Sequence, residues 1–292
     1  SVCYKKVITL SDKELKGLVF LHFGAVDFHS YIYVNGKLAD EHIGGYASFK
    51  VDITSFVNEG ENTIFVIAED DVRSMKNPSG KQSAKYDSYG CFYTRATGIW
   101  QTVWLEPVNY CRIENIRLTP DIDKSVINIE VFHTCKCGGK ITAKIFDGNN
   151  TYFEGEIDAK AEISIPDAKL WSPENPFLYD LELTLDCNGE TDTVKSYFGM
   201  RKFSVEADES GVKRLFLNGK PYFMNGVLDQ GYWPDGIFTP ATPECYADDI
   251  MMMKKLGFNT LRKHIKVEPE EFYYQCDKLG MIVFQDMVNN GD

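Results

Sequence analysis

The sequence predicts a mainly β protein, in which two antiparallel β-sandwiches precede a short parallel β/α segment. Two observations support this fold class. Short strand-like runs separated by turn residues continue from Leu18 to Phe198. After Val205 the pattern changes, and apolar residues at helical spacing alternate with short apolar runs. Alternation of strands and helices is typical of a parallel sheet, so the last part of the chain differs in class from the first two.

Composition excludes several classes of partner. The chain has 292 residues, 43% of them hydrophobic and 13% aromatic, which is enough for the cores of two or three domains. Its formal charge is −12, and it contains no run of Lys and Arg that could neutralise a phosphate backbone. It has no apolar stretch of the roughly 20 residues that a membrane helix needs. We therefore expect neither a nucleic-acid partner nor a membrane span, and composition leaves the oligomeric state open.

Strands of the first sandwich are predicted at residues 18–23, 31–34, 49–53, 63–68 and 99–105. Asn35-Gly36 favours a tight hairpin, because both residues tolerate the positive φ of a type I′ turn. Between Asp70 and Phe92 the strand pattern gives way to a long loop. Long loops in compact domains are usually functional or disordered.

Strands of the second sandwich are predicted at residues 126–132, 140–146, 161–165, 179–185 and 193–198. Their spacing favours an immunoglobulin-like architecture. A strand at 222–227, a helix opened by Thr242 and Pro243, a strand at 258–262, a helix at 269–279 and a strand at 281–284 then give β-α-β-α-β. This is the repeating unit of a parallel sheet.

The eight cysteines are scattered through a chain too large to need disulfides, so most are predicted to be buried small hydrophobes. Cys135 and Cys137 place two thiols on one side of a strand, but no second Cys or His pair follows at zinc-ligand spacing. No metal site is predicted from this pattern. The scattered cysteines slightly favour a cytoplasmic location over a periplasmic or secreted one.

An ordered series of motifs resembles glycoside hydrolase family 2, the family of β-galactosidases, β-glucuronidases and β-mannosidases. The first part carries residues 31–36 and 98–106, which look like the sugar-binding domain of that family. The second carries residues 170–179 and 198–201, which look like its immunoglobulin-like domain. The third carries residues 217–221, 253–259 and 276–280.

The resemblance implies three domains and an activity. Residues 1–108 would be a jelly-roll-like sugar-binding domain truncated at its start, residues 109–204 an immunoglobulin-like β-sandwich, and residues 205–292 the start of an incomplete (β/α)8 barrel. The implied activity is that of a retaining O-glycosyl hydrolase acting on terminal β-linked sugars, with β-galactosidase-like specificity slightly ahead of β-glucuronidase or β-mannosidase. A closed barrel takes about 250 residues. The two catalytic glutamates are therefore expected beyond Asp292, and the chain alone is expected to be inactive.

Barrel enzymes place their chemistry at the carboxyl ends of strands, which indicates five candidate residues for substrate binding or active-site support. By resemblance, Arg262 would orient a catalytic carboxylate, or else form a structural ion pair. His264 would contact sugar or make a structural hydrogen bond, and Asp286 would bind a sugar hydroxyl or support the site. In the loop after the first strand, Asp229 would accept sugar hydroxyls and Trp233 would stack on a pyranose, or pack the loop on the neighbouring sandwich.

Other aromatic residues are assigned different roles. Trp100, Trp104 and Trp171 are predicted to be core residues. The region 86–93 is the candidate for a sandwich loop that narrows the active-site pocket. No cofactor is predicted, although a structural or active-site Mg, Na or Ca ion stays open because no EF-hand-like spacing decides it.

A second class of function is a non-catalytic carbohydrate-binding or adhesion module built from sandwiches. The β-α-β-α-β segment weighs against this alternative, because a binding module has no use for an unclosed parallel sheet. In both hypotheses the partner is a carbohydrate, whose sugar and linkage the sequence does not identify.

Overall fold

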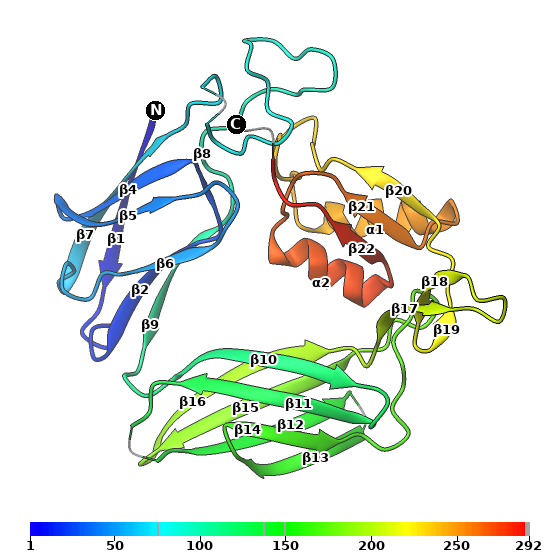
Figure 1. Ribbon diagram of the computed structural model, residues 1–292. Coiled ribbons are helices and arrows are strands. Elements are labelled where there is room, and N and C mark those ends of the chain that lie inside the picture. Colours follow the sequence, from blue (N-terminus) through cyan, green and yellow to red (C-terminus); the bar gives the residue numbers. More distant parts are fainter. Residues whose placement is uncertain (75, 137, 149, 290–292) are drawn as a thin grey trace.

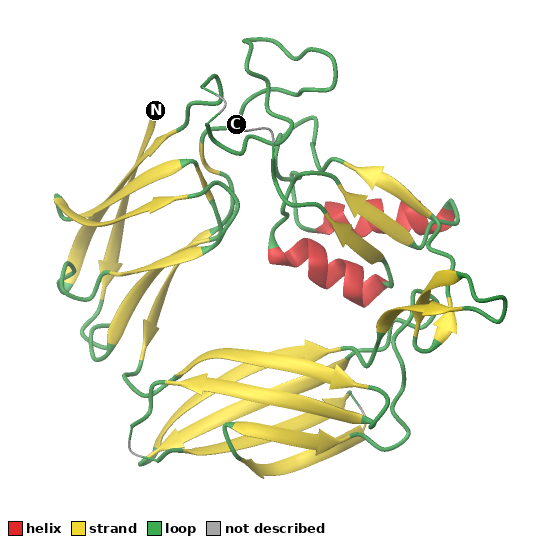
Figure 2. Ribbon diagram, in the orientation of Figure 1, coloured by secondary structure: helices red, strands yellow, loops and turns green. Residues whose placement is uncertain are grey.

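The computed structural model describes residues 1–74, 76–136, 138–148 and 150–289. The chain forms three parts arranged in an open arc, with the first sandwich in blue, the second in green and the β/α segment in yellow to red (Figure 1). Both described helices belong to the third part (Figure 2). Among the described residues, no helix is long and apolar enough to cross a membrane.

The first sandwich packs the sheet β1-β7-β4-β5 against the sheet β6-β2-β9, with the short pair β3-β8 at one end. Its core gathers inward-facing residues of both sheets, including Val19, Phe23 and Ile32. Asn35 and Gly36 have φ values of 50° and 80°, which confirms the predicted tight hairpin between β4 and β5. The strands are β1 (Val2–Leu10), β2 (Leu18–Phe23), β3 (Val26–Asp27), β4 (His29–Val34), β5 (Lys37–Ile43), β6 (Phe49–Asp52), β7 (Gly60–Glu69), β8 (Gly98–Ile99) and β9 (Val103–Val108).

Two features of this sandwich differ from the predictions. Strand β1 was not predicted, because most of its residues are exposed and it lacks an alternating apolar pattern. The predicted strand at 99–105 is divided into β8 and β9, and between them the Trp100 indole donates a hydrogen bond to the Gly45 carbonyl (2.7 Å). Trp104 is 44% exposed and stacks on His22, so its assignment to the core was wrong. On an outward-facing strand position, stacking alone leaves much of an indole in contact with water.

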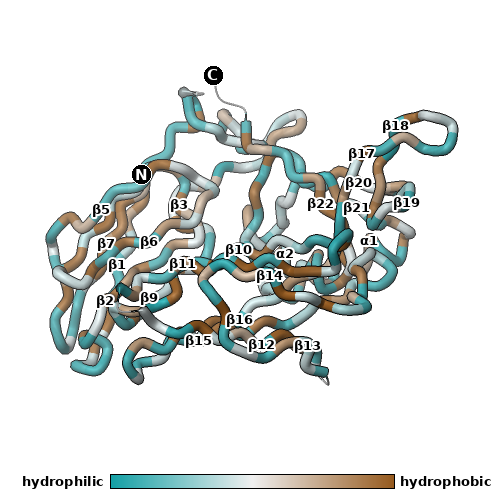
Figure 3. Tube along the Cα trace, turned by 60° about the horizontal axis from the view of Figure 1, so that its bottom comes forward, coloured by the Kyte–Doolittle hydropathy of each residue, from teal (hydrophilic) through white to brown (hydrophobic). Residues whose placement is uncertain are grey.

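The second sandwich packs the sheet β10-β11-β14 against the sheet β13-β12-β15-β16. Hydrophobic residues of these strands, such as Ile127, Ile145 and Leu183, fill the space between the sheets. Figure 3 shows hydrophobic colour along the strands and hydrophilic colour at many of the turns. The strands are β10 (Ile113–Asp121), β11 (Val126–His133), β12 (Lys140–Asp147), β13 (Asn150–Ile157), β14 (Lys160–Ser164), β15 (Tyr179–Cys187) and β16 (Glu190–Phe198).

The third part begins with a small antiparallel sheet and continues as a parallel β/α unit. Strands β20, β21 and β22 pair in parallel and in sequence order, with α1 and α2 as crossovers. Gly280 ends α2 in the left-handed conformation, as predicted. The elements are β17 (Phe203–Ala207), β18 (Lys213–Leu217), β19 (Lys220–Pro221), β20 (Gly226–Asp229), α1 (Glu244–Lys255), β21 (Thr260–Lys263), α2 (Glu270–Leu279) and β22 (Ile282–Gln285).

The first parallel strand starts later than predicted. Residues 222–225 are not part of a strand, because their backbone is held by side chains of the next connection. Asn259 donates from Nδ2 to the Phe223 carbonyl (3.0 Å), and the Asn259 backbone N–H donates to the Asn225 carbonyl (3.0 Å). Thr242 also does not cap α1: the N-cap residue is Pro243, and no side-chain hydrogen bond caps the helix.

Trp171 joins the second sandwich to the β/α segment. Its side chain is fully buried, and its indole N–H donates to the Asp277 carbonyl on α2 (2.7 Å). Arg201 lies over the ring, 4.4 Å from a ring centroid, and also pairs with the Asp277 carboxylate (2.5 Å). A buried indole with a satisfied N–H thus ties the Trp-Ser-Pro turn of the sandwich to the second helix.

We expect Trp171→Ala to lower the free energy of unfolding by about 3–5 kcal/mol, because it leaves a large cavity and an unpaired carbonyl at this junction. The matched control is Trp104→Ala, whose indole is partly solvated and whose loss should cost about 1 kcal/mol or less. Urea unfolding of both variants, followed by circular dichroism, measures the difference. Equal losses for the two tryptophans would contradict this account of the junction.

Candidate functional site at the carboxyl ends of the parallel strands

The candidate site lies where the three parallel strands end. Asp229 ends β20, Lys263 ends β21 and Gln285 ends β22, and these three residues are register partners across the sheet. Carboxyl ends of parallel strands gather functional side chains because they share one edge of the sheet. At this edge the Gly80 N–H, from the first sandwich, donates to the Asn289 carbonyl (2.9 Å). The first sandwich therefore contacts the same edge that carries the candidate residues.

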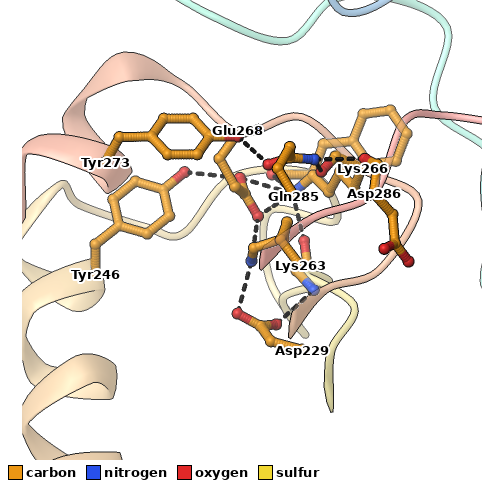
Figure 4. Close-up of polar contacts among 10 residues, drawn as sticks. Asp229, Tyr246, Lys263, Lys266, Glu268, Tyr273, Gln285 and Asp286 are labelled. Atoms are coloured by element: carbon orange, nitrogen blue, oxygen red, sulfur yellow. Dashed lines mark hydrogen bonds and ion pairs between the residues drawn. The ribbon is translucent and has the colours of Figure 1, made fainter. Parts of the chain in front are cut away.

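A buried ionic network lies directly beneath this edge (Figure 4). Glu268 has a fully buried side chain and accepts hydrogen bonds from Lys263 Nζ (2.8 Å) and Lys266 Nζ (3.0 Å). Lys263 also donates to Asp229 Oδ2 (2.6 Å). Two lysines and two carboxylates thus balance each other in charge, which a buried cluster of this kind requires.

The two lysines experience this environment differently. For Lys263, burial opposes the charged form, but the carboxylates of Glu268 and Asp229 outweigh it and raise the pKa. For Lys266, burial prevails over the attraction of Glu268 and lowers the pKa to about 8. The difference follows from partners, because Lys263 contacts two carboxylates whereas Lys266 contacts one.

Lys266 also fixes the loop that follows β20. Its ammonium donates to the carbonyls of Gly231 and Phe238, and it lies within cation–π distance of the rings of Trp100, Tyr232 and Phe238. Trp100 belongs to the first sandwich, so one buried charge connects both parts of the chain.

Arg262 and Asp286 lie together at the ends of β21 and β22. Arg262 Nε is 3.1 Å from both carboxylate oxygens of Asp286, and its terminal nitrogen is 3.0 Å from Oδ2. The Asp286 backbone N–H donates to the Lys263 carbonyl (3.0 Å). The Arg262 side chain is 57% exposed, so the pair presents an oriented guanidinium–carboxylate surface rather than a buried ion pair.

His264 is held beside this pair through its backbone, whose N–H donates to the Asp229 carbonyl (2.8 Å). Its Nδ1 is buried, and among the described residues it has no hydrogen-bond partner. Burial, aided by the charge of Lys81, lowers the pKa of the imidazole, while Asp286 opposes this effect. His264 is therefore neutral near pH 7 and has one ring nitrogen that the protein leaves without a partner in the described chain.

Asp229 and Trp233 do not present themselves to an open surface. Asp229 uses Oδ2 for Lys263 and Oδ1 for the Gly231 N–H (2.7 Å), so both of its oxygens are occupied. Trp233 packs edge to face on Tyr246 of α1, at 5.8 Å between ring centroids. Its neighbour Tyr232 stacks on Tyr93 of the first sandwich at 4.2 Å. Of the two aromatic residues, Tyr232 packs on the sandwich and Trp233 packs on the barrel segment.

The long loop of the first sandwich lies over the strand ends. Tyr93 stacks on Tyr232, and Lys81 is close enough to His264 to influence its titration. In Figure 1 this segment projects above the β/α segment. Tyr86, at the start of the region considered as a pocket-narrowing loop, is 84% exposed. The base of the loop is thus anchored, whereas Tyr86 faces solvent.

A buried carboxyl group stabilises the base of this loop. Asp27 accepts a hydrogen bond from Gln82 Nε2 (2.8 Å), and the Gln82 side-chain oxygen accepts the Ala96 N–H (2.8 Å). Burial raises the pKa of Asp27 to about 7, the charge of Asp70 adds to the effect and the Gln82 hydrogen bond opposes it. Gly45 packs so closely that a Cβ there would lie 2.3 Å from Asp27 Oδ1.

Each carboxylate at the strand ends is engaged by a cation. Asp229 and Glu268 share Lys263, and Asp286 is held by Arg262. Retaining glycoside hydrolysis needs two carboxyl groups about 5–5.5 Å apart on either side of the scissile bond, one of them as nucleophile. In the described part of the chain, none of these three carboxylates is placed to attack a sugar. The edge can orient a substrate or a further carboxylate, but it does not supply the catalytic pair.

Comparison with known proteins identifies the family. A sequence profile described as "Glycosyl hydrolases family 2, sugar binding domain" matches residues 1–105, and the profile "Glycosyl hydrolases family 2" matches residues 111–201. The chain belongs to glycosyl hydrolase family 2. In family terms the first sandwich is the sugar-binding domain.

Curated relatives and solved structures of this family extend over nearly the whole chain. A putative β-glucuronidase of Formosa agariphila is 27% identical over 97% of this chain and 34% of its own length. A β-galactosidase of Thermoanaerobacterium thermosulfurigenes is 26% identical over 98% of this chain and 41% of its own length. The β-D-glucuronidase structure from Dictyoglomus thermophilum superposes with a TM-score of 0.84 at 22% identity, over 98% of this chain and half of that chain. The chain thus spans about a third to a half of the length of these proteins.

Sequence reasoning missed the residues that organise this family 2 site. Lys263, Lys266 and Glu268 follow β21 in a short connection, where charged residues usually face solvent. Gln82 and Asp27 are 55 positions apart, so only the folded chain shows their contact. The one available signal was a strand end followed closely by three ionisable residues, which is too common to indicate burial.

We expect Glu268→Gln to lower the free energy of unfolding by about 3–5 kcal/mol, because it removes the carboxylate that compensates two buried ammonium groups. Glu270→Gln is the control, since Glu270 is exposed in the first turn of α2 and contributes at most about 1 kcal/mol to the helix dipole interaction. Urea unfolding monitored by tryptophan fluorescence measures both. A loss below 1 kcal/mol for Glu268→Gln would show that the network does not hold this edge.

Asp27 predicts a pH dependence of stability. Its folded-state pKa of about 7 exceeds the ordinary value of 3.8, so its stabilising contribution is complete below about pH 4 and is lost as the pH rises through 7. Asp27→Asn should therefore be stabilised relative to the parent by a few kcal/mol at pH 8 compared with pH 4, since each unit of pKa corresponds to about 1.4 kcal/mol. Unfolding curves at both pH values test this, with the exposed Asp12→Asn as control. Parallel pH profiles of parent and Asp27→Asn would refute it.

Proposed function

We propose that this chain is the sugar-binding and immunoglobulin-like part, with the first barrel strands, of a retaining β-glycosidase that removes terminal β-linked sugars. The observation that carries the proposal is the ordered match of two family 2 profiles followed by a parallel β/α unit. That order is what the curated relatives share over nearly the whole of this chain.

The sugar-binding domain is proposed to shape the substrate site rather than to act on its own. Its contacts with the strand ends run through Tyr93, Trp100 and Gly80, which touch the loops after β20 and β22. A loop fixed at the carboxyl edge of a barrel can exclude water and limit the length of substrate that enters. This geometry supports an exo-acting enzyme, which accepts a terminal sugar in a pocket.

The proposed substrate is a terminal β-D-glucuronide, with a β-D-galactoside as the second candidate. The putative β-glucuronidase of Formosa agariphila and the β-galactosidase of Thermoanaerobacterium thermosulfurigenes match this chain at 27% and 26% identity. A further relative named β-glucuronidase, from Homo sapiens, is 23% identical over 98% of this chain. These relatives do not support the slight preference for β-galactosidase drawn from the sequence, because the β-glucuronidase name is at least as well represented.

The Arg262–Asp286 pair is proposed to face the sugar. A guanidinium held by two hydrogen bonds on one carboxylate keeps a fixed direction, and its exposed side can donate to a hydroxyl or to a further carboxylate. His264 lies beside it with an unpartnered ring nitrogen, which fits hydrogen bonding to a bound sugar. Asp229 is proposed as a support residue, because both of its oxygens are already used.

One observation favours the second class of function, non-catalytic carbohydrate binding. A cleft of about 660 Å³ lies between the sugar-binding domain and the beginnings of α1 and α2, and it is lined by Trp104, His22 and Glu270 among others. Exposed aromatic faces beside polar groups suit the apolar and hydroxyl-bearing faces of a pyranose. The experiment below separates this role from catalysis.

The test is hydrolysis of nitrophenyl β-D-glucuronide, β-D-galactoside, β-D-mannoside and β-D-glucoside by two proteins, the 292-residue chain and the product of its whole reading frame. We expect hydrolysis by the whole product, with β-D-glucuronide preferred. No hydrolysis is expected for the chain alone, because its strand-end carboxylates are engaged by cations. Nitrophenol release measures both.

The outcomes distinguish the alternatives. A preference for β-D-galactoside would reverse the substrate assignment but keep the glycosidase. Calorimetric binding of oligosaccharides without hydrolysis by either protein would support the carbohydrate-binding module instead. Equal hydrolysis by the short chain would show that a catalytic carboxylate pair lies within residues 1–292.

A further inference from the structure

Three cysteines converge at one end of the second sandwich, far along the chain from the candidate active site. Cys111 lies just before β10, Cys135 just after β11, and Cys187 is the last residue of β15. The Sγ atoms of Cys135 and Cys187 are 2.9 Å apart, and those of Cys187 and Cys111 are 3.1 Å apart. All three sulfurs lie within 4.8 Å of one another. Cys137, the second member of the pair considered in the sequence, lies outside the described residues.

The arrangement departs from the predicted scatter of buried cysteines. Cys3 and Cys91 are exposed, which corrects the expectation that most cysteines are buried. Cys135 and Cys187 are buried as expected, but they meet each other and the half-buried Cys111 instead of packing as isolated hydrophobes. Such convergence of sulfur atoms from three separate segments is a feature of metal-ligating sites.

The cluster connects the two sheets of the sandwich. Cys111 and Cys135 flank strands of the β10-β11-β14 sheet, whereas Cys187 belongs to the opposite sheet. Close packing surrounds it, because a Cβ added at Gly139 would lie 3.0 Å from Cys135 Sγ. Three thiol-bearing residues from both sheets, enclosed at the edge of a hydrophobic core, form a preorganised set of soft ligands.

We propose that Cys111, Cys135 and Cys187, in the reduced protein, ligate a structural Zn²⁺ ion that joins the two sheets of the second sandwich. At a Zn–S distance of about 2.3 Å, two thiolates on a tetrahedral zinc ion are roughly 3.8 Å apart. The closest sulfur pairs therefore need to separate by less than about 1 Å, which small side-chain rotations supply. Three thiolates leave the fourth position of the ion to a water molecule or another donor.

The oxidation state controls the site. Cys187 is disulfide-bonded in the structure, and a disulfide sulfur does not act as a thiolate ligand. A dithiol or phosphine reductant must first transfer two electrons to this disulfide, and two protons then complete the two thiols. Binding of Zn²⁺ by the three thiols releases their protons. Reduction thus exchanges a covalent link in this sandwich for a metal link.

The test uses the 292-residue chain reduced with a phosphine, exchanged into reductant-free anaerobic buffer and incubated with Zn²⁺ or Co²⁺. We expect one zinc per chain by elemental analysis after gel filtration, and intense sulfur-to-cobalt charge-transfer absorption in the near ultraviolet. Zinc should also raise the unfolding temperature, because the ion binds only the folded site. The chain oxidised with diamide should retain no zinc.

Cys111→Ser should lose the bound zinc, the cobalt absorption and the zinc-dependent rise in unfolding temperature, whereas the exposed Cys3→Ser should keep all three. Unfolding of Cys111→Ser without metal, compared with the metal-free parent, shows whether this variant folds. Should it be unfolded, blocking of the reduced parent by zinc against a thiol-specific alkylating agent replaces it as the readout. Absence of zinc in the reduced parent, or equal zinc in the oxidised chain, would overturn the proposal.

Discussion

The carboxylate of Glu268 is the constraint on which the strand-end site depends. It lies out of water between two ammonium groups, and each of those groups extends into a different part of the surroundings. Lys263 reaches Asp229 at the end of β20, and Lys266 reaches the carbonyls of the following loop. Because an uncompensated buried charge is costly, these positions are coupled and the loop takes its place with the network.

The two sandwiches hold this edge of the β/α segment from opposite directions. The sugar-binding domain contacts the loops at the strand ends through aromatic stacking, with Tyr93 on Tyr232. The second sandwich contacts α2 through Trp171 and the Arg201–Asp277 pair. Family 2 accessory domains in this chain therefore position the carboxyl edge of the parallel strands. Its exposed Arg262–Asp286 pair is left facing the space where a substrate would lie.

Local patterns predicted the elements well where one face is buried and the other is wet. The strand at 18–23 and the Asn35-Gly36 hairpin were located correctly, because alternation and positive φ are written in neighbouring residues. Strand β1 was missed because its residues are mostly exposed and its pairing with β7 lies far along the chain. Trp104 was misplaced for a related reason, since an aromatic residue on a strand does not reveal which face is covered.

The sequence by itself determined the order of the three parts, the family and the strand ends that carry Arg262, His264 and Asp286, because these follow from local periodicity and ordered motifs. Only the tertiary structure decided which groups are partners. It brought Asp286 onto Arg262, closed both oxygens of Asp229, turned Trp233 onto α1 and gathered Cys111, Cys135 and Cys187. Charge compensation and sulfur contact depend on distances of a few ångströms between segments far apart in sequence, and no local pattern specifies those distances.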